Sequence, residues 1–260
     1  MTPGKLILLF GNSDADALAW RARVNAAGGS VSQATYSAVV KFSRSCKAAG
    51  IWDKLNRVNL FCGDQLTAAL VPLKVGAGNA TDTNVNFVSG DYTESAGLTG
   101  NGSSKYLATG VSDAVFGLTA HVAAYLRVVP SQVLAGIIGS NATLLQRTTD
   151  PRTATRIGSA SQEASINGAA TPAFLVGSRT SSTAIALYRN GTVLATNSNP
   201  VTDGTGGAIN VFARGSGFND RFENGTLGAY SVGPSLSNPE VAAYNTIMEA
   251  FQDALNRGVQ

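Results

Sequence analysis

The segment from Ala184 to Asn197 constrains this chain more than any other, because it reads as a β-hairpin. Two apolar-rich arms flank Asn190-Gly191, a dipeptide that accepts the positive φ angles of a type I′ turn. This turn pairs Tyr188 with Val193, and the side chains then alternate between two faces. The first face is predicted to be buried in a core and carries Ile185, Leu187 and Leu194. The second face is small and smooth, which suits a covering layer or a shallow groove, and carries Ala184, Ala186, Tyr188, Val193 and Ala195.

A two-stranded hairpin is not stable alone, so the rest of the chain must supply more sheet. Further strand candidates follow one another at spacings of about ten residues, separated by turn residues. They are residues 58–62, 84–88, 105–109, 122–129, 134–139, 143–147, 156–159, 173–177, 208–214 and 226–232. Only 13% of the residues are charged and 29 are glycine, which is typical of short strands joined by turns. Because strands and helices do not alternate, we predict a mainly β protein, an antiparallel jelly-roll β-sandwich.

Helical patterns occupy the N-terminal part of the chain. Ser13 is predicted to cap a helix that ends at Gly28, and Ser32 is predicted to cap a second helix that ends at Gly50. The apolar segment Leu6–Phe10 is too short for a signal peptide or a membrane span, and we expect it to be a strand or an arm. These helices are too short to form a core of their own, so they should pack on the sheet.

A helix is also predicted at the C-terminal end of the chain. Ser237–Glu240 matches a capping box, with Pro239 in the first turn. The apolar stripe that follows either packs on the sandwich or binds a partner subunit. We therefore predict three regions: an N-terminal arm and helical region at 1–55, a β-sandwich at 56–233, and a C-terminal helix packed on the sandwich at 234–260.

Composition argues against several functions. The net charge is +3, and no stripe of lysine or arginine marks a nucleic-acid surface. No segment approaches the ~20 apolar residues that a membrane span needs. His121 is the one histidine, and with Cys46 and Cys62 it forms no metal-ligand spacing, so we expect no metal and no cofactor. The two cysteines are either buried free thiols or a disulfide.

Three segments resemble the concanavalin A-like lectin/glucanase superfamily in its LamG-like jelly-roll form. They are LTGNGSSKYL at Leu98–Leu107, ALYRNGTV at Ala186–Val193 and SLSNPEVAAY at Ser235–Tyr244. A further stretch, Trp52–Tyr106, is similar to structural proteins of tailed phages and prophages. The resemblance covers roughly residues 57–250 and implies a lectin-like sandwich in a virion protein, but a fold does not fix a function.

Enzymatic sites known in that superfamily have no clear counterpart here. Its glucanases carry paired acids on one strand, which supply glycoside hydrolysis. Asp220 and Glu223 are the nearest approximation, and they lie in a predicted loop, so hydrolysis is not expected. A catalytic triad would need His121, which has no motif around it. Some members bind calcium through loop oxygens, for which Asp203, Asn219 and Asp220 are candidates, although turn formation explains these residues without a metal.

Sugar binding usually combines an aromatic platform with planar polar side chains. The candidates for such a site are Tyr188, Arg214, Phe218, Asn219 and Asp220, with Arg221 beside them. The alternative is that Phe218 anchors a loop and Arg221 is solvated.

We therefore expect a non-enzymatic structural or accessory protein of a phage virion: a capsid-decoration, fibre or tail-associated subunit. Its partners would be other virion subunits, as a homo-oligomer, and its location the particle surface. The alternative is a carbohydrate-binding adhesin that recognises host-surface glycans, and a glycan hydrolase is the third option. The arm Met1–Phe10 and the exposed part of the helix at 237–257 are predicted to contribute to assembly.

Overall fold

The structure is a computed structural model, and it describes residues 13–76, 81–130, 134–140, 143–148, 152–159, 161–167, 171–202, 207–215 and 220–260. It is mainly β, with two antiparallel sheets forming a sandwich and helices at both ends of the chain, which confirms the predicted fold class. The predicted arm Met1–Phe10 lies outside the described residues. The boundaries of the three predicted regions, 1–55, 56–233 and 234–260, stay a prediction.

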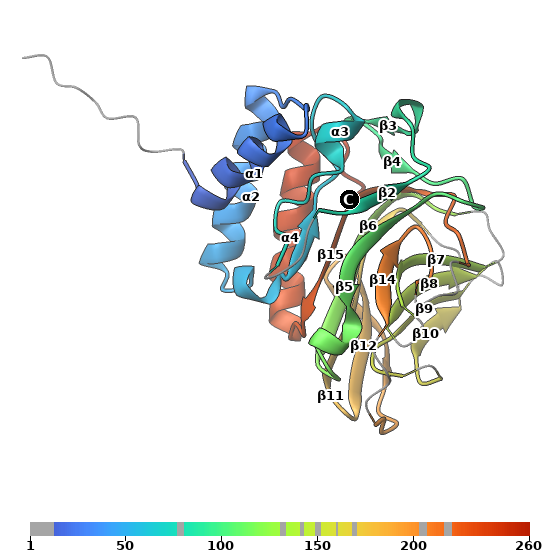
Figure 1. The fold of residues 1–260 in the computed structure, drawn as a ribbon. Coiled ribbons are helices and arrows are strands. Elements are labelled where there is room, and N and C mark those ends of the chain that lie inside the picture. Colours follow the sequence, from blue (N-terminus) through green and yellow to red (C-terminus); the bar gives the residue numbers. More distant parts are fainter. Residues whose placement is uncertain are drawn as a thin grey trace, which may run out of the picture.

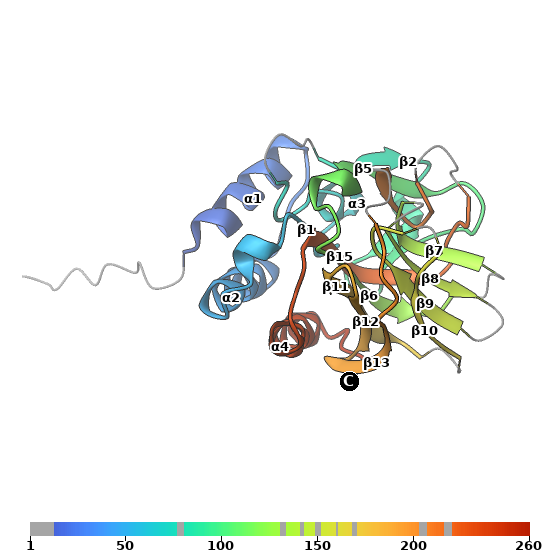
Figure 2. The ribbon, with the colours of Figure 1, turned by 90° about the horizontal axis from the view of Figure 1, so that it is seen from below.

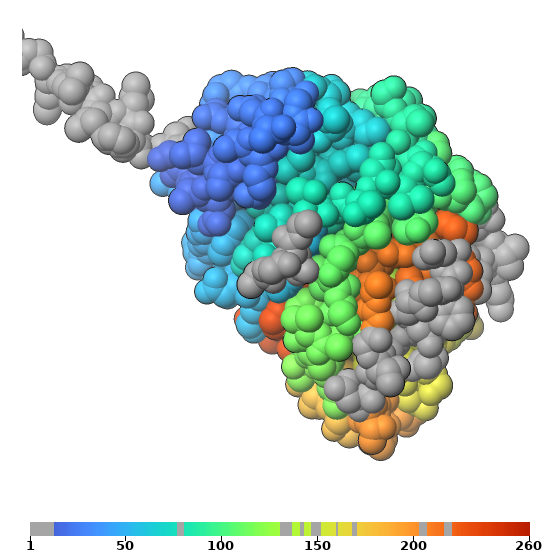
Figure 3. All heavy atoms as spheres, viewed as in Figure 1, coloured from blue at the N-terminus to red at the C-terminus, as the bar shows by residue number. Residues whose placement is uncertain are grey.

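Within the described ranges the strands form an eight-stranded sheet A and a seven-stranded sheet B. Sheet A has the order β13-β12-β11-β6-β15-β4-β3 with β1 also paired to β15, and sheet B has the order β10-β9-β8-β7-β14-β5-β2. The strands are β1 (Arg57–Asn59), β2 (Thr83–Val85), β3 (Tyr92–Thr93), β4 (Gly97–Thr99), β5 (Tyr106–Ser112), β6 (Ala120–Val128), β7 (Leu134–Gly139), β8 (Leu144–Thr148), β9 (Arg152–Arg156), β10 (Ala164–Asn167), β11 (Ala173–Ser181), β12 (Ala184–Arg189), β13 (Thr192–Asn197), β14 (Ala208–Val211) and β15 (Thr226–Pro234). In Figure 3 the orange atoms around β14 lie beside the green atoms of β5, its partner in sheet B.

The helices form a third layer that covers the outer face of sheet A (Figures 1 and 2). They are α1 (Ala15–Ala26), α2 (Gln33–Ala48), the short α3 (Leu66–Ala69) and α4 (Asn238–Ala254), with 3₁₀ turns at Trp52–Lys54, Ser89–Asp91 and Asp113–Val115. The apolar stripe of α4 packs against this face, because Val241, Tyr244 and Met248 share a core with Tyr125 and Phe174 of sheet A. No helix in the described part of the chain is long and apolar enough to cross a membrane.

A second apolar core fills the space between the two sheets. It contains residues of alternate positions on β6, such as Val122 and Leu126, together with Leu187 of β12 and Val211 of β14. Tyr125, on the opposite face of β6, belongs to the helix-covered core. The side chains of β6 therefore alternate between two cores, because each face of the strand enters a different one.

The β12–β13 hairpin confirms the predicted turn and corrects the predicted register. Asn190 and Gly191 have φ angles of 52° and 77°, as a type I′ turn requires. Tyr188 pairs with Val193 as expected, but a bulge then shifts the pairing so that Leu187 faces Ala195. Ala195 therefore packs toward the core between the sheets. The core-face residues behave differently from one another, because Ile185 and Leu187 are buried and Leu194, at the bulge, is half-buried.

The same register shift places Thr196 opposite Ala186, on the outer face of sheet A. A β-bulge adds one residue to one strand and reverses the alternation beyond it. The small, smooth face predicted from the sequence thus gains a hydroxyl group, and this change matters for the groove described below.

The structure confirms some of the other predicted caps and strands and corrects the rest. Asp14 caps α1 in place of Ser13, because its carboxylate accepts hydrogen bonds from the backbone N–H groups of Asp16 and Ala17, both at 3.1 Å. Ser32 caps α2, and the predicted capping box of Ser237 and Glu240 is present at α4. The strand predicted at 156–159 is β9, which ends at Arg156. The strands β3 and β10 and the helix α3 were not predicted, whereas β4 and the start of β5 match the strand-turn-strand that the resemblance implied at Leu98–Leu107.

Buried polar groups join segments that are distant in the sequence, including the helices and the sandwich. Arg257, which follows α4, is 1% exposed, and its guanidinium donates to the backbone carbonyls of Leu60, Phe61, Glu94 and Gly228 over 2.7–3.0 Å. In β1, the buried Arg57 pairs with Asp82 at 2.6 Å, and the Tyr230 hydroxyl donates to the same carboxylate. Cys46 and Cys62 are buried and free, and burial raises the pKa of the Cys62 thiol to about 12.

Candidate functional site

A hollow lies on the outer face of sheet A, where the strands β11, β12 and β13 meet the start of α4. Its volume is about 240 Å³. The strand register brings Ala184, Ala186, Tyr188 and Thr196 to this face. The complete lining, hereafter the α4 groove, is Ser178, Thr180, Thr183, Ala184, Ile185, Ala186, Tyr188, Thr196, Asn197, Ser198 and Asn238.

The start of α4 is fixed in place by contacts with sheet A and with the segment before β1. The Ser178 hydroxyl donates to the Leu236 carbonyl at 2.7 Å and accepts from the Leu236 N–H at 2.9 Å. Glu240 accepts from the backbone N–H of Ser237 and forms an ion pair with Lys54 at 2.7 Å. The first residue of the helix is therefore held rigidly at the rim of the groove, and that residue is Asn238.

One hydrogen bond joins the two sides of the α4 groove. The Tyr188 hydroxyl donates to Oδ1 of Asn238 at 2.5 Å. Tyr188 itself is 2% exposed and packs in the core under α4, so its ring offers an edge to the groove and no open platform. Burial raises the pKa of the Tyr188 phenol, which therefore stays protonated at physiological pH.

The polar groups of the lining fall into two sets. Ser178 and Asn197 are satisfied within the protein, since Ser178 binds Leu236 and the Asn197 amide donates to the Glu163 carbonyl at 2.8 Å. In contrast, Thr180, Thr196 and Ser198 are exposed and make no side-chain hydrogen bond with any described residue. Their hydroxyl groups remain available to a ligand.

The α4 groove is electrically neutral. None of its lining residues carries a charge at neutral pH, and the floor is formed by the methyl groups of Ala184 and Ala186. A charged ligand would lose hydration there without gaining an ion pair, which disfavours it. The arrangement suits a small neutral molecule rich in hydroxyl groups, with an apolar face for the floor.

The sugar-site residues predicted from the sequence do not form one site. Tyr188 lines the α4 groove, on sheet A. Arg214 and Asp220 form an antiparallel bridge after β14 of sheet B, so the structure does not bring them together with Tyr188. Phe218 and Asn219 lie outside the described residues, and so does the calcium candidate Asp203.

Arg214 and Asp220 are partners of each other. The Arg214 guanidinium donates two hydrogen bonds to the Asp220 carboxylate, at 2.7 and 2.5 Å. Arg221 is half-buried and donates to Oε1 of Gln146 at 2.6 Å, so it is not simply solvated. Burial, followed by the charges of Arg221 and Arg214, lowers the pKa of Arg156 on β9 to about 10. These contacts hold the bridge against the outer face of sheet B.

The residues considered for catalysis occupy structural positions. Glu223 is fully buried, and its Oε1 accepts from the Gly225 N–H at 2.8 Å. His121 is fully buried between the Pro234 carbonyl at 2.7 Å and the Ser231 hydroxyl at 3.2 Å, and burial lowers its pKa to about 4. Among the described residues, no three His, Cys, Asp or Glu side chains are grouped so that they could hold a metal ion.

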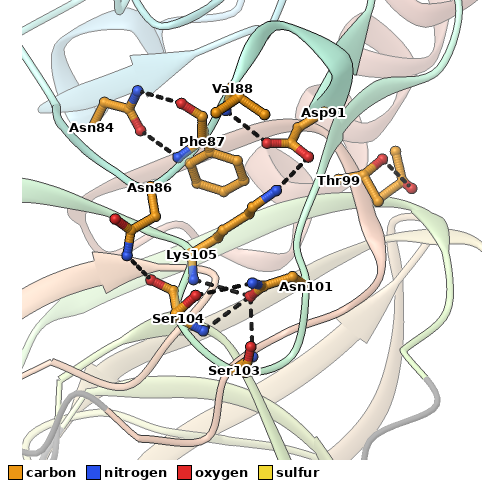
Figure 4. A network of polar contacts seen from close by, with 11 residues as sticks. Asn84, Asn86, Phe87, Val88, Asp91, Thr99, Asn101, Ser103, Ser104 and Lys105 are labelled. Carbon is orange, nitrogen blue, oxygen red and sulfur yellow. Dashed lines mark hydrogen bonds and ion pairs between the residues drawn. The ribbon is translucent and has the colours of Figure 1, made fainter.

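The motif at Leu98–Leu107 builds a loop, as Figure 4 shows. Oδ1 of Asn101 accepts from the backbone N–H groups of Ser103, Ser104 and Lys105 over 2.9–3.1 Å. The Lys105 ammonium pairs with Asp91 at 2.5 Å. This segment of the resemblance therefore stabilises the connection between β4 and β5.

The sequence analysis missed Asn238 and the threonine and serine hydroxyls of the groove. Asn238 is separated from Tyr188 by 50 positions and sits inside a capping-box motif that already explained its surroundings. One weak signal was present, because asparagine is a poor helix former and its side chain competes for backbone groups. Thr196 reaches the outer face only through the bulge, which the sequence does not predict.

No family model matches this chain, and no curated protein matches it. Solved structures do share its sandwich. The NanB sialidase from Streptococcus pneumoniae is 15% identical with a TM-score of 0.41, over 55% of this chain and 27% of that chain. A structure of botulinum neurotoxin type C, whose cell entry depends on interaction with two ganglioside molecules, is 12% identical with a TM-score of 0.41, over 57% of this chain and 42% of that chain.

A third similar structure is the CBM40 of the Ruminococcus gnavus IT-sialidase, bound to α2,3 sialyllactose. It is 11% identical with a TM-score of 0.40, over 56% of this chain and 86% of that chain. The chain thus spans less than half the length of the sialidase and toxin chains and most of the carbohydrate-binding module. Likeness of this degree concerns the fold alone, and the functional argument rests on the α4 groove.

Proposed function

We propose that this protein is a non-catalytic carbohydrate-binding domain and that the α4 groove receives a sugar unit of a neutral glycan. The observation that carries the proposal is the lining of the groove. It combines a small apolar floor, the edge of an aromatic ring and a rim of free hydroxyl and amide groups, without a charged side chain. Sugar rings present the same combination of an apolar face and a hydroxyl rim.

The shape of the groove also supports this function. A volume of about 240 Å³ is below the range of about 300–1,000 Å³ typical of pockets for drug-sized ligands. It suits one or two sugar rings of a longer chain, with the remainder in solvent. The walls are preorganised, because β12 is paired with β11 on one side and with β13 on the other. The start of α4 is held in place by Ser178 and Glu240. A preorganised site loses little conformational entropy on binding.

A groove-filling variant tests the proposal. Ala186→Leu places a larger side chain on the floor of the α4 groove, at an outer-face position that borders the helix-covered core and not the core between the sheets. The full chain and this variant would be compared on an array of neutral, sialylated and sulfated oligosaccharides. Ala114→Leu, at an exposed position outside the groove, is the matched control. We expect binding to neutral glycans that Ala186→Leu abolishes and Ala114→Leu leaves unchanged; equal binding by both variants would refute the proposal.

A second candidate function rests on the similarity of Trp52–Tyr106 to structural proteins of tailed phages. We propose that the domain serves on the surface of a virion, as a concanavalin A-like decoration, fibre or tail-associated subunit that assembles with its own copies and other virion subunits. Glycan binding and a place in a particle are compatible, since an adhesin on a virion would recognise its host. Deletion of residues 1–10 is expected to leave the melting transition unchanged and to abolish oligomerisation or particle incorporation. Normal assembly of the truncated chain would exclude that role for the arm.

A further inference from the structure

The hydrogen bond between Tyr188 and Asn238 fixes which atoms face the α4 groove. The phenol is the donor in this bond, because an amide Oδ1 can only accept. The Tyr188 proton is therefore already used, and its oxygen offers only lone pairs to a ligand. Burial raises the pKa of the phenol, so this state persists across the physiological pH range.

The same bond sets the direction of the Asn238 amide. Oδ1 is turned toward Tyr188, so the Nδ2 group is turned away from it. Asn238 is exposed and lines the groove, and its Nδ2 makes no hydrogen bond with any residue that the structure describes. The groove thus presents one free amide donor beside one free phenol acceptor.

The positions of these two atoms are rigid. Tyr188 is 2% exposed and packed under α4, and it pairs with Val176 and Val193 in the strands on either side. Asn238 is the first residue of α4 and directly follows the capping-box residue Ser237 and the anchored Leu236. A fixed donor beside a fixed acceptor selects ligands by the pattern of their hydrogen-bonding groups.

We propose that the Tyr188–Asn238 pair recognises two adjacent free hydroxyl groups of an uncharged sugar. One hydroxyl oxygen accepts from Asn238 Nδ2, and the neighbouring hydroxyl donates to Tyr188 Oη. Such a vicinal diol provides the acceptor and the donor side by side. The inference rests on the proposed function and narrows it to neutral saccharides that keep a vicinal diol unsubstituted.

The hydroxyls of Thr180, Thr196 and Ser198 complete this picture at the rim. They are exposed, can each donate or accept, and are joined to no described side chain. They tolerate a variety of substituents around the diol, so the Tyr188–Asn238 pair is the part of the groove with a fixed polarity. Selectivity should therefore follow the diol more than the remaining positions of the ring.

Substitutions that reverse one polarity at a time test the inference. Asn238→Asp keeps the size of the side chain and its acceptor for Tyr188, but replaces the amide donor by a carboxylate oxygen. An acid in the first turn of a helix is favourable, so α4 should be retained. Tyr188→Phe removes the phenol acceptor and keeps the ring. Asn245→Asp, on the same helix and outside the groove lining, is the matched control.

Binding would be measured with the full chain by saturation-transfer NMR, using the methyl glycosides of glucose, galactose and mannose and their monodeoxy derivatives. We expect Asn238→Asp and Tyr188→Phe each to weaken binding of the preferred glycoside by roughly tenfold, as expected for the loss of a hydrogen bond. Removing either hydroxyl of one vicinal pair should have a similar effect, and Asn245→Asp should have none.

The outcomes separate the inference from the proposed function. Suppose that Ala186→Leu abolishes binding, but that Asn238→Asp binds the glycoside as tightly as the unaltered chain and every monodeoxy sugar binds as tightly as its parent. The groove then binds sugars, and the diol inference is wrong. If the unaltered chain binds none of the glycosides and no neutral glycan, both the proposed function and the inference fail. Stronger binding of a sialylated or sulfated ligand to Asn238→Asp than to the unaltered chain would also overturn the diol inference.

Discussion

Replacing Arg257 by methionine tests how α4, whose first residue Asn238 lines the α4 groove, is held. The guanidinium lies at the end of α4 and donates to four backbone carbonyls, those of Leu60, Phe61, Glu94 and Gly228, and to the side chain of Gln252 at 2.6 Å. All these contacts are buried, because Arg257 is only 1% exposed. Arg257 therefore joins α4 to sheet A and to the segments beside it.

The cost of Arg257→Met follows from the acceptors it leaves behind. An unsatisfied buried acceptor costs about 1–3 kcal/mol, but methionine also removes the desolvation penalty of a buried charge. Taking the low end for each of the four carbonyls, we expect the free energy of unfolding to fall by about 4 kcal/mol. Arg257→Lys should recover only part of this loss, because one ammonium cannot reach donors in so many directions.

Urea unfolding followed by far-ultraviolet circular dichroism measures this change. Arg189→Met is the matched control, since Arg189 is half-buried on β12 and its side chain makes no hydrogen bond with a described residue. Its effect should stay within about 0.5 kcal/mol. A loss for Arg257→Met no larger than that of the control would refute the reasoning that the buried guanidinium holds α4.

Three further predictions concern the core, the pH dependence and catalysis. Leu187→Ala empties a fully buried site between the sheets and should cost about 2–5 kcal/mol in urea unfolding. Because burial lowers the folded-state pKa of His121 to about 4, below that of the unfolded chain, its contribution to stability should be lost as the pH falls from about 6.5 to 4. His121→Asn should reduce that slope by up to about 1.4 kcal/mol per pH unit, and an unchanged slope would contradict it. No reducing sugar should be released from common polysaccharides; release that disappears in Glu223→Gln would show that the domain is an enzyme.

The sequence predicted those parts of the fold that depend on local patterns. The turn at Asn190-Gly191 requires positive φ angles that few other dipeptides tolerate, and the capping box at Ser237 carries its own hydrogen-bond partners. The two faces of β6 alternate because each meets a continuous core. These features are visible in one short segment at a time.

The remaining features depend on contacts between distant segments. The bulge beside Leu187 lies where β12 and β13 contact the neighbouring β10, and it places Thr196 on the outer face. The separation of Tyr188 from Arg214 follows from the assignment of their strands to different sheets, which composition and alternation do not specify. The groove arises where a strand face meets the start of a helix 50 positions away. Of the Tyr188–Asn238 pair, the sequence therefore identified only Tyr188 as a candidate.

The central claim is that the α4 groove binds a neutral sugar, and chemical-shift mapping tests it most directly. The full chain, labelled with ¹⁵N, would be titrated with the neutral oligosaccharide that binds best on the array. We predict shift changes that saturate with ligand and cluster at Ala186, Thr196 and Asn238. Saturable changes confined to the bridge of Arg214 and Asp220, or no changes at millimolar ligand, would contradict the assignment of the site.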